Sequence, residues 1–315
     1  MEGFCPIKEI DLNWEVLTLK LLKDKRLAAG NNFGKLNIYN LDNYQPDIII
    51  EGQFNKLITN IIQISNGDLI VSSQKIVKII KITKNTFSII QNIELTGGVY
   101  DIGYGCGGIY LITSKIIELN NKILAISIYR NNLIQLWKKD NGFYFNYDNL
   151  IEKEPSINEI FEINPNYLLS DNDYYKHLVI WDIKNKQKKA ILKGINVNTI
   201  ISDNKTSFIN KKVIAYCGNK YLYIIEINKF FIFQTIKLEN DLISICLFSK
   251  NILFIGNNKG ILYQFEIYNL NFRIKDKNKL EYKEICSIIK IDDNRLAIGF
   301  CKSILLILKN KLLKI

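Results

Sequence analysis

The feature that most constrains this chain is a pattern that returns seven times along its length. The segment "RLAAGNNFGKLNIYNL" (residues 26–41) has counterparts that start near residues 68, 123, 167, 213, 252 and 295. Each copy has one leading aliphatic residue, and these are Leu27, Leu69, Leu124, Leu168, Ile214, Leu253 and Leu296. The spacings between them range from 39 to 55 residues and average about 45, which matches the period of about 40–45 residues expected for a four-stranded repeat unit.

Every copy contains the same succession of short segments. An apolar segment, such as residues 58–65, leads into a polar turn, a strand of four or five residues, a tight turn and an alternating strand. The tight turns "NNFG" (31–34) and "NNKG" (257–260) supply residues that tolerate positive φ, as hairpins require. The segments are too short and too rich in β-branched residues for helices. We therefore predict an all-β fold, a seven-bladed β-propeller of four-stranded antiparallel blades, as a single domain over residues 1–315.

The two ends of the chain predict how the last blade is completed. The seventh copy stops after its third strand, at residues 303–309, with no fourth strand behind it. A strand-like segment, "PIKEIDL" (6–12), precedes the first copy. We expect this segment to pair as the outer strand of the last blade, because the pairing closes the ring and removes two open sheet edges.

One copy carries a family signature. Its third strand, "HLVIWDI" (177–183), ends in Trp181-Asp182, and partial echoes stand at residues 136–137, 38–39 and 225–226. With its period and strand order, the chain resembles the WD-repeat family of seven-bladed propellers over nearly its full length. The chain departs from the family because most WD and Gly-His dipeptides are lost.

The resemblance implies a structural role for a few residues. In the family, a Gly-His pair, a strand hydroxyl, a turn aspartate and the tryptophan form a buried hydrogen-bonded network. Here it implies part of that network in one blade, from Ser170, Asp171 or Asp173, and Trp181. The only histidine, His177, falls in the turn or early strand rather than at the Gly-His position. We expect the blades to be held mainly by apolar packing between them.

Composition limits the compartment. Hydrophobic residues make up 48% of the 315 residues and charged residues 23%, so the chain can bury a large core and is not disordered. No apolar run approaches the ~20 residues of a membrane helix, and the first residues lack the features of a signal peptide. We expect a cytoplasmic or nuclear protein with no membrane insertion.

The cysteines give no sign of a metal site or a disulfide framework. Neither a C-x-x-C pair nor a histidine at metal-ligand spacing accompanies the six of them, Cys5, Cys106, Cys217, Cys246, Cys286 and Cys301. We predict that all six are reduced core residues and that the protein needs no metal or other cofactor.

No catalytic constellation stands out. A single histidine cannot be placed in a nucleophile, base and acid set, and the carboxylate pairs lie in predicted turns, where aspartate is common. The glycine-rich stretch at residues 97–108 could cradle a phosphate, but a strand-like sequence follows it in place of the required helix. We predict a protein that is not an enzyme and has no small-molecule substrate.

Two loops predict an aromatic face. The stretch at residues 97–108 is an insertion that lengthens one repeat and brings tyrosines among glycines, and the turn at residues 173–177 is also aromatic. The direction of the strands places both loops on one face. Aromatic side chains on loops suit partner binding, although the inserted tyrosines could instead fold back over the adjacent blade. The predicted partner-binding residues are Tyr100, Tyr104, Tyr110, Tyr174, Tyr175 and His177.

The opposite face is predicted to be basic. The formal net charge is +11, and two lysine-rich runs, residues 184–189 and 273–283, are expected to connect third strands to fourth strands there. The predicted basic residues are Lys184, Lys186, Lys188, Lys189, Arg273, Lys275 and Lys277. Only four of the 42 basic residues are arginines, which argues against base-specific recognition. Solvated turns are the plainer interpretation of both runs.

Two functional hypotheses follow from these features. The first is a non-catalytic scaffold or adaptor that binds other proteins in an intracellular multiprotein complex through its aromatic face. The second is a propeller associated with RNA or ribonucleoprotein through its basic face. Binding that weakens steeply with rising salt would favour the second hypothesis.

Overall fold

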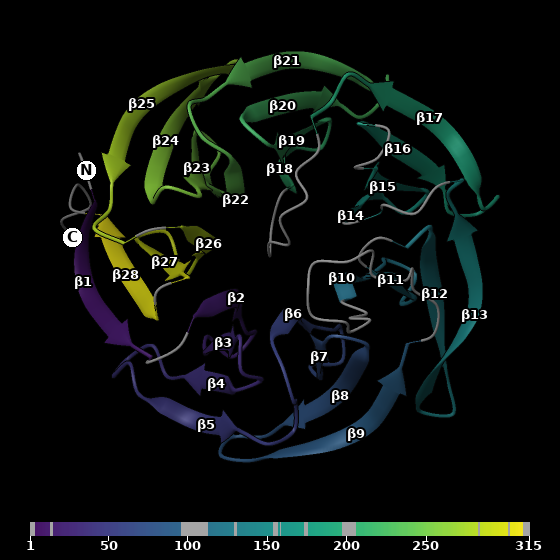
Figure 1. Ribbon diagram of the computed structural model, residues 1–315, viewed down its shortest axis with the longest axis vertical. Coiled ribbons are helices and arrows are strands. Elements are labelled where there is room, and N and C mark those ends of the chain that lie inside the picture. The colour runs from purple at the N-terminus through teal and green to yellow at the C-terminus, as the bar shows by residue number, and fades with distance from the viewer. Residues whose placement is uncertain are drawn as a thin grey trace, which may run out of the picture. The chain divides into compact units, whose positions relative to one another are not determined.

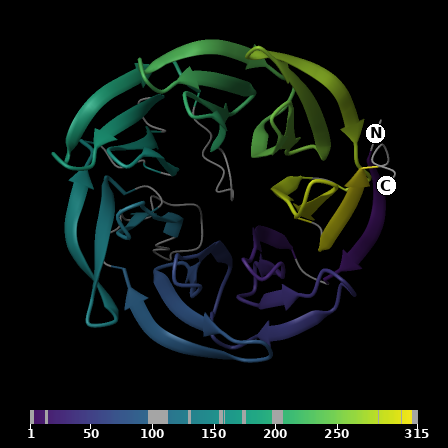
Figure 2. The ribbon, with the colours of Figure 1, turned by 180° about the vertical axis from the view of Figure 1, so that it is seen from behind.

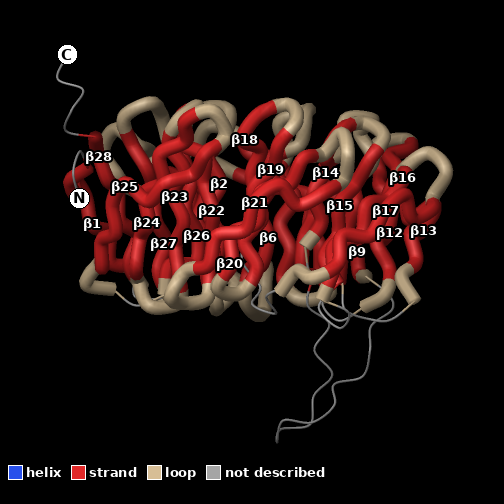
Figure 3. Tube along the Cα trace, turned by 90° about the horizontal axis from the view of Figure 1, so that it is seen from above, coloured by secondary structure: helices blue, strands red, loops and turns tan. Residues whose placement is uncertain are grey.

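The computed structural model describes residues 4–12, 15–95, 113–128, 131–153, 157, 159–172, 176–196, 206–282, 284–301 and 303–310. Every regular element among these residues is a β-strand, as Figure 3 shows. The strands form seven four-stranded antiparallel sheets. The predicted fold class, an all-β propeller of seven blades, is confirmed. Within the described residues there is no helix long and apolar enough to span a membrane.

The chain divides into two compact units, residues 1–53 with 202–315, and residues 54–201. We number the blades in the chain order of their first strands. The first unit contains blades 1, 5, 6 and 7, and the second contains blades 2, 3 and 4. Within each unit the first strands of successive blades contact one another (Figure 1). The single domain over residues 1–315 stays a prediction.

The first unit contains sixteen of the described strands. Blade 1 consists of β2 (Val16–Leu21), β3 (Leu27–Asn31), β4 (Leu36–Tyr39) and β5 (Pro46–Ile50). Blade 5 consists of β18 (Thr206–Asn210), β19 (Val213–Gly218), β20 (Tyr221–Glu226) and β21 (Phe231–Lys237). Blade 6 consists of β22 (Leu242–Ser249), β23 (Ile252–Asn257), β24 (Ile261–Tyr268) and β25 (Asn271–Lys279). Blade 7 consists of β26 (Ile285–Lys290), β27 (Arg295–Phe300), β28 (Ile304–Asn310) and β1 (Phe4–Asp11).

The second unit contains the other twelve described strands. Blade 2 consists of β6 (Ile58–Gln63), β7 (Leu69–Ser73), β8 (Ile76–Ile82) and β9 (Phe87–Glu94). Blade 3 consists of β10 (Thr113–Glu118), β11 (Leu124–Ile128), β12 (Leu133–Asp140) and β13 (Phe143–Ile151). Blade 4 consists of β14 (Ile160–Asn164), β15 (Tyr167–Asn172), β16 (His177–Asp182) and β17 (Gln187–Lys193).

The fourth strand of blade 7 comes from the beginning of the chain, as the sequence predicts. Strand β1 pairs antiparallel with β28, from Phe4 opposite Asn310 to Asp11 opposite Ile304, and Figure 2 shows the two strands side by side. The Phe4 ring packs edge-on against the rings of Phe248 and Phe254 in blade 6, at centroid distances of 5.2 Å each. Strand β1 therefore completes blade 7 and also ties it to blade 6.

The repeat register follows from burial. The seven leading aliphatic residues of the copies are all 0% exposed. Each pairs with the third-strand residue that occupies the position of Trp181, and these partners are Tyr39, Ile80, Trp137, Trp181, Ile225, Phe265 and Leu308. A β-bulge interrupts the pairing of third and fourth strands in all seven blades. The bulge increases the local twist, so the outer strand turns away from the direction of the first three.

The two asparagine-rich turns are stabilised by the same pair of hydrogen bonds. The Asn31 side chain is buried, and its Oδ1 accepts hydrogen bonds from two backbone N–H groups of the turn at 3.0 and 2.6 Å. Asn257 makes the same two contacts at 3.0 and 2.7 Å. Gly34 and Gly260 follow with φ of 81° and 75°, a backbone conformation that favours glycine. These turns therefore connect second to third strands as the sequence predicts.

Two of the cysteines depart from the prediction of six reduced thiols. Cys286 in β26 and Cys301 after β27 form a disulfide with a Cα–Cα distance of 6.2 Å. Cys217, which is buried, and Cys5 and Cys246, which are half-buried, form no disulfide. Burial raises the pKa of Cys246 to about 12, so this thiol is unreactive at neutral pH. Cys106 lies outside the described residues.

Candidate functional site

The tryptophan of blade 4 makes the buried contact that the WD-repeat resemblance implies. Trp181 is 1% exposed, and its Nε1 donates a hydrogen bond to Ser170 Oγ at 2.8 Å. Asp171 is fully buried and accepts a hydrogen bond from the Glu159 backbone N–H at 2.7 Å. Asp173 lies outside the described residues. The contact between Trp181 and Ser170 that the resemblance implies is therefore present, and Trp181, Ser170 and Asp171 are all buried inside blade 4.

The remaining signature residues are also structural. Asp182 accepts hydrogen bonds from the backbone and side chain of Asn185 at 2.9 Å each, which lowers the pKa of its carboxyl. Trp137, the echo in blade 3, donates instead to Gln135 Oε1 at 3.1 Å. Blade 3 carries Ile126 where blade 4 carries Ser170, so the family hydrogen bond has no acceptor there.

The predicted aromatic face rests almost wholly on residues outside the described part of the chain. Tyr100, Tyr104, Tyr110, Tyr174 and Tyr175 all fall there, so their placement on one face stays a prediction. His177 is the first residue of β16 and is 9% exposed. Its side chain therefore offers little surface to a partner.

The predicted basic face is corrected in its location. Arg273, Lys275 and Lys277 lie in the outer strand β25, and Lys188 and Lys189 lie in the outer strand β17. Of the seven predicted residues, the other two, Lys184 and Lys186, lie in the turn between β16 and β17. The prediction that both runs connect third to fourth strands is therefore wrong for most of their length, because an outer strand carries charged residues on its solvent side and so resembles a turn in sequence.

Four of the seven basic residues are neutralised by carboxylates. Lys275 lies 3.8 Å from Glu266 within blade 6, and the other three pairs cross to the preceding blade of the same unit. The crossing pairs are Lys186 with Asp148, Lys188 with Glu152, and Lys277 with Glu239. These pairs remove part of the positive charge on which the RNA hypothesis depends.

An exposed row of large apolar side chains lies on the outer strand of blade 3. Phe143, Phe145 and Tyr147 are 55%, 45% and 37% exposed, and Ile151 at the end of the strand is 61% exposed. We call these four residues the β13 row. Sequence reasoning missed them, although the alternation in "FYFNYDNLI" was the available signal.

Some backbone hydrogen-bonding groups of β13 beside this row already have side-chain partners. Gln91 of blade 2 donates from Nε2 to the Tyr144 carbonyl and accepts from the Tyr144 N–H, both at 2.7 Å. Further along, the Asp148 N–H donates to Asn146 Oδ1 at 3.1 Å. The amide of Gln91 thus acts as a one-residue strand partner, which blocks pairing of another chain at that point.

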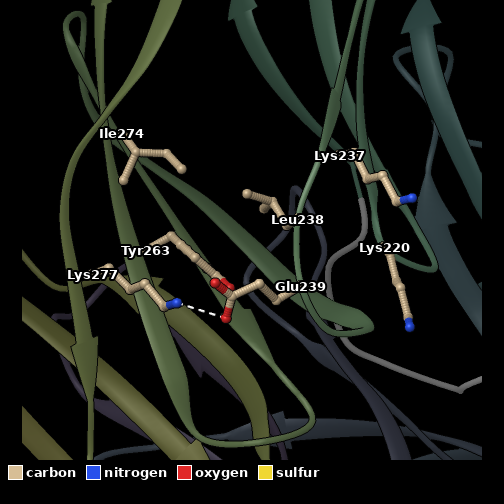
Figure 4. A pocket seen from close by; sticks show the side chains of 7 residues that line it. All are labelled: Lys220, Lys237, Leu238, Glu239, Tyr263, Ile274 and Lys277. Atoms are coloured by element: carbon tan, nitrogen blue, oxygen red, sulfur yellow. Dashed lines mark hydrogen bonds and ion pairs between the residues drawn. The ribbon is translucent and has the colours of Figure 1, made fainter.

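A groove of about 440 Å³ lies between blades 5 and 6 (Figure 4). We call it the blade 5–6 groove, and its lining residues are Lys220, Lys237, Leu238, Glu239, Tyr263, Ile274 and Lys277. Tyr263 is 1% exposed, and burial raises the pKa of its hydroxyl, an effect that Lys277 partly offsets. Lys277 donates to Glu239 at 2.6 Å. The groove therefore offers three lysines and one carboxylate around a mostly apolar centre.

A second groove, of about 410 Å³, lies between blades 7 and 1 and serves as an internal comparison. It has the same place relative to its blades, since Lys8 comes from the outer strand β1 and Asn37 from the third strand β4. Lys35 in this groove pairs with Glu51. The two grooves share their framework and differ in their charges.

A scan against protein-family models and a search of curated proteins both find no match to this sequence. Membership of the WD-repeat family therefore stays a prediction that rests on the repeat and on the contact between Trp181 and Ser170. Among the described residues, no three His, Cys, Asp or Glu side chains gather as metal ligands.

Proposed function

We propose that this β-propeller is a non-enzymatic interaction scaffold that holds other proteins in an intracellular multiprotein complex. The observation that carries the proposal is the β13 row. If each ring has about 150–250 Å² of surface, the exposed fractions of Phe143, Phe145 and Tyr147 leave about 200–350 Å² in solvent. The largest apolar patch of a typical monomer is about 300–600 Å² and is often functional. Ile151 extends the row further.

The backbone hydrogen bonds already made beside the β13 row limit how a partner could bind. Because Gln91 satisfies both backbone groups of Tyr144, a partner cannot extend the sheet there and must bind through side chains. Aromatic rings are common anchors of such contacts, with polar groups around them. The ion pair of Lys186 and Asp148 lies beside Tyr147 and supplies a polar rim.

We further propose that the chain is a divergent WD-repeat propeller. The buried hydrogen bond from Trp181 to Ser170 supports this, together with the pairing of Leu168 with Trp181 that recurs at the equivalent positions. A cytoplasmic or nuclear location is part of the same proposal.

Affinity capture of tagged protein from the cells that express it tests the scaffold role. The variant Phe143→Ser/Phe145→Ser should lose partners that the unaltered protein retains at high salt, because it removes two exposed rings without touching the core. The matched control is Phe231→Ser/Phe233→Ser, which changes two rings of similar exposure, 39% and 50%, on β21. Equal partner sets for both variants would contradict the assignment to the β13 row.

The same experiment separates the other predicted surfaces. Loss of partners only in a variant with Tyr104, Tyr174 and Tyr175 changed to alanine would place the contact on the predicted aromatic face. RNA that dominates at low salt and is lost at high salt would favour the RNA hypothesis. In that case, charge reversal at Lys184 and Lys189, which form no salt bridge with a described carboxylate, should weaken capture most.

A further inference from the structure

The positive charge of the blade 5–6 groove is only partly compensated. Glu239 pairs with Lys277 at 2.6 Å, whereas Lys220 and Lys237 have no carboxylate partner among the described residues. Figure 4 shows both of these lysines pointing away from the Lys277 and Glu239 pair, on the other side of Leu238. One end of the groove is thus an ion pair and the other is an uncompensated pair of ammonium groups.

The Tyr263 hydroxyl lies against the groove and makes only weak hydrogen bonds. Among the described residues it has no hydrogen-bond partner of standard geometry, and its polar contacts, which partly offset the rise in pKa that burial causes, are with the Asn257 side chain and the Glu239 backbone. The Tyr263 and Asn257 side chains are at least 99% buried, and the Tyr263 hydroxyl lies next to the Glu239 carboxylate in Figure 4. A hydrogen bond to a charged acceptor is stronger than one between neutral groups, so this hydroxyl favours an incoming carboxylate.

From these contacts we propose that the blade 5–6 groove binds an extended acidic segment of a partner protein, and that Glu239 holds the place of one ligand carboxylate. In the complex, a ligand carboxylate replaces Glu239 on Lys277 and accepts a hydrogen bond from Tyr263. A second acidic residue pairs with Lys220 and Lys237. An apolar side chain between the two covers Leu238 and Ile274.

The exchange at Glu239 requires little energy. Its side chain is 67% exposed and that of Lys277 is 40% exposed, and exposed ion pairs contribute only about 0.2–1 kcal/mol. The carboxylate of Glu239 can therefore swing into water when a ligand carboxylate arrives. The ligand adds the contact with Lys220 and Lys237, which Glu239 cannot reach while it stays on Lys277.

The lining favours a peptide over a nucleic acid. Single-stranded nucleic acids bind where exposed aromatic rings stack on bases, but the only ring among the lining residues, Tyr263, is 1% exposed. No arginine is present to form two hydrogen bonds with a phosphate. Leu238 and Ile274 instead offer the apolar contact that a peptide side chain needs.

Fluorescence anisotropy with the purified protein tests this inference. The probe is a fluorescein-labelled nonapeptide of three Glu-Asp-Leu repeats, and the comparison probes are its Lys-Lys-Leu analogue and a labelled ten-nucleotide uridine RNA. Glu239→Gln should tighten peptide binding about three-fold, because the competing carboxylate is gone. Lys220→Met/Lys237→Met should weaken it about ten-fold. Lys8→Met/Lys35→Met in the other groove is the matched control and should change the Kd less than about two-fold.

Several outcomes would overturn the proposal. Weaker or unchanged peptide binding by Glu239→Gln would refute the place-holder role, and an equal loss in the Lys8→Met/Lys35→Met control would show that only net charge is measured. Tighter binding of the uridine RNA than of the peptide would make the groove a nucleic-acid site. The inference needs the scaffold role only in that the ligand is a protein segment. Because the β13 row takes no part in this assay, failure of one proposal is distinguishable from failure of the other.

Discussion

Replacing Phe4 with alanine should destabilise the protein by about 3 kcal/mol. The Phe4 side chain is 3% exposed and packs edge-on against two rings of blade 6. Truncation of a buried phenylalanine costs about 3–5 kcal/mol. The lower end of this range applies because Phe4 is the first residue of β1, where the backbone can relax into part of the cavity that the missing ring leaves. The loss tests whether β1 ties blade 7 to blade 6.

The expected change in melting temperature follows from the chain length. With about 2.1 cal/mol/K of unfolding entropy per residue, the 315 residues give about 0.7 kcal/mol/K. A loss of about 3 kcal/mol then lowers the Tm by about 4 °C if the chain unfolds in one transition. Calorimetry measures the Tm, and urea titration gives the free energy of unfolding independently.

A matched control lies on the same strand. Ile7 is 40% exposed, so Ile7→Ala should cost less than about 1 kcal/mol. Deletion of residues 1–13 removes the whole strand and should lower the Tm further than Phe4→Ala. If Phe4→Ala and Ile7→Ala lower the Tm equally, the burial of Phe4 between blades is refuted. If the deletion leaves the melt unchanged, β1 does not complete blade 7.

Three further variants test other contacts. Ser170→Ala should cost about 1–3 kcal/mol in a urea titration, because it leaves the buried Trp181 Nε1–H without an acceptor; an unchanged titration midpoint would show that the hydrogen bond adds nothing. Purified protein oxidised in air should have four alkylatable cysteines after denaturation, and breaking the pair of Cys286 and Cys301 should cost about 3 kcal/mol for its 15-residue loop; six reactive thiols would show that these two sulfurs do not bond. Gln91→Ala should uncover the edge of β13 and increase self-association in size-exclusion chromatography; a variant that stays as dispersed as the unaltered protein would show that the edge needs no cover.

The sequence could predict the blade register because burial sets it. Leu168 pairs with Trp181, and the leading residue of each other copy pairs with the equivalent third-strand position. All seven leading residues are fully buried, so a polar substitution at any of them would be costly. The repeat therefore survives in the apolar positions even where the Trp-Asp signature has gone.

The candidate sites could not be predicted in the same way, since they combine residues from different blades. Tyr263 and Glu239 are 24 positions apart, and nothing in their local sequence indicates that the hydroxyl lies beside the carboxylate. The outer strand β25 alternates lysine with other residues, a pattern that resembles a charged turn. The disulfide of Cys286 and Cys301 joins strand β26 to the residue that follows β27, and the spacing of the two cysteines matches no motif.

The framework that fixes the fold also leaves room for chemical variety. One third-strand position lies two residues before the site equivalent to Trp181 in every blade, and it holds Asn37, Lys78, Gln135, Val179, Tyr223, Tyr263 and Leu306. The Lys78 ammonium lies over the Phe54 ring at 5.7 Å, and Gln135 accepts from Trp137. Tyr263 instead places a buried hydroxyl beside the exchangeable ion pair of Lys277 and Glu239. Asn37 in the groove between blades 7 and 1 also has a buried oxygen without a partner of standard geometry, so an unmet hydrogen bond does not distinguish the two grooves. The blade 5–6 groove is lined by three lysines and one carboxylate, whereas the other is lined by two lysines and two carboxylates, and this excess of positive charge is what singles it out as a place for an acidic ligand.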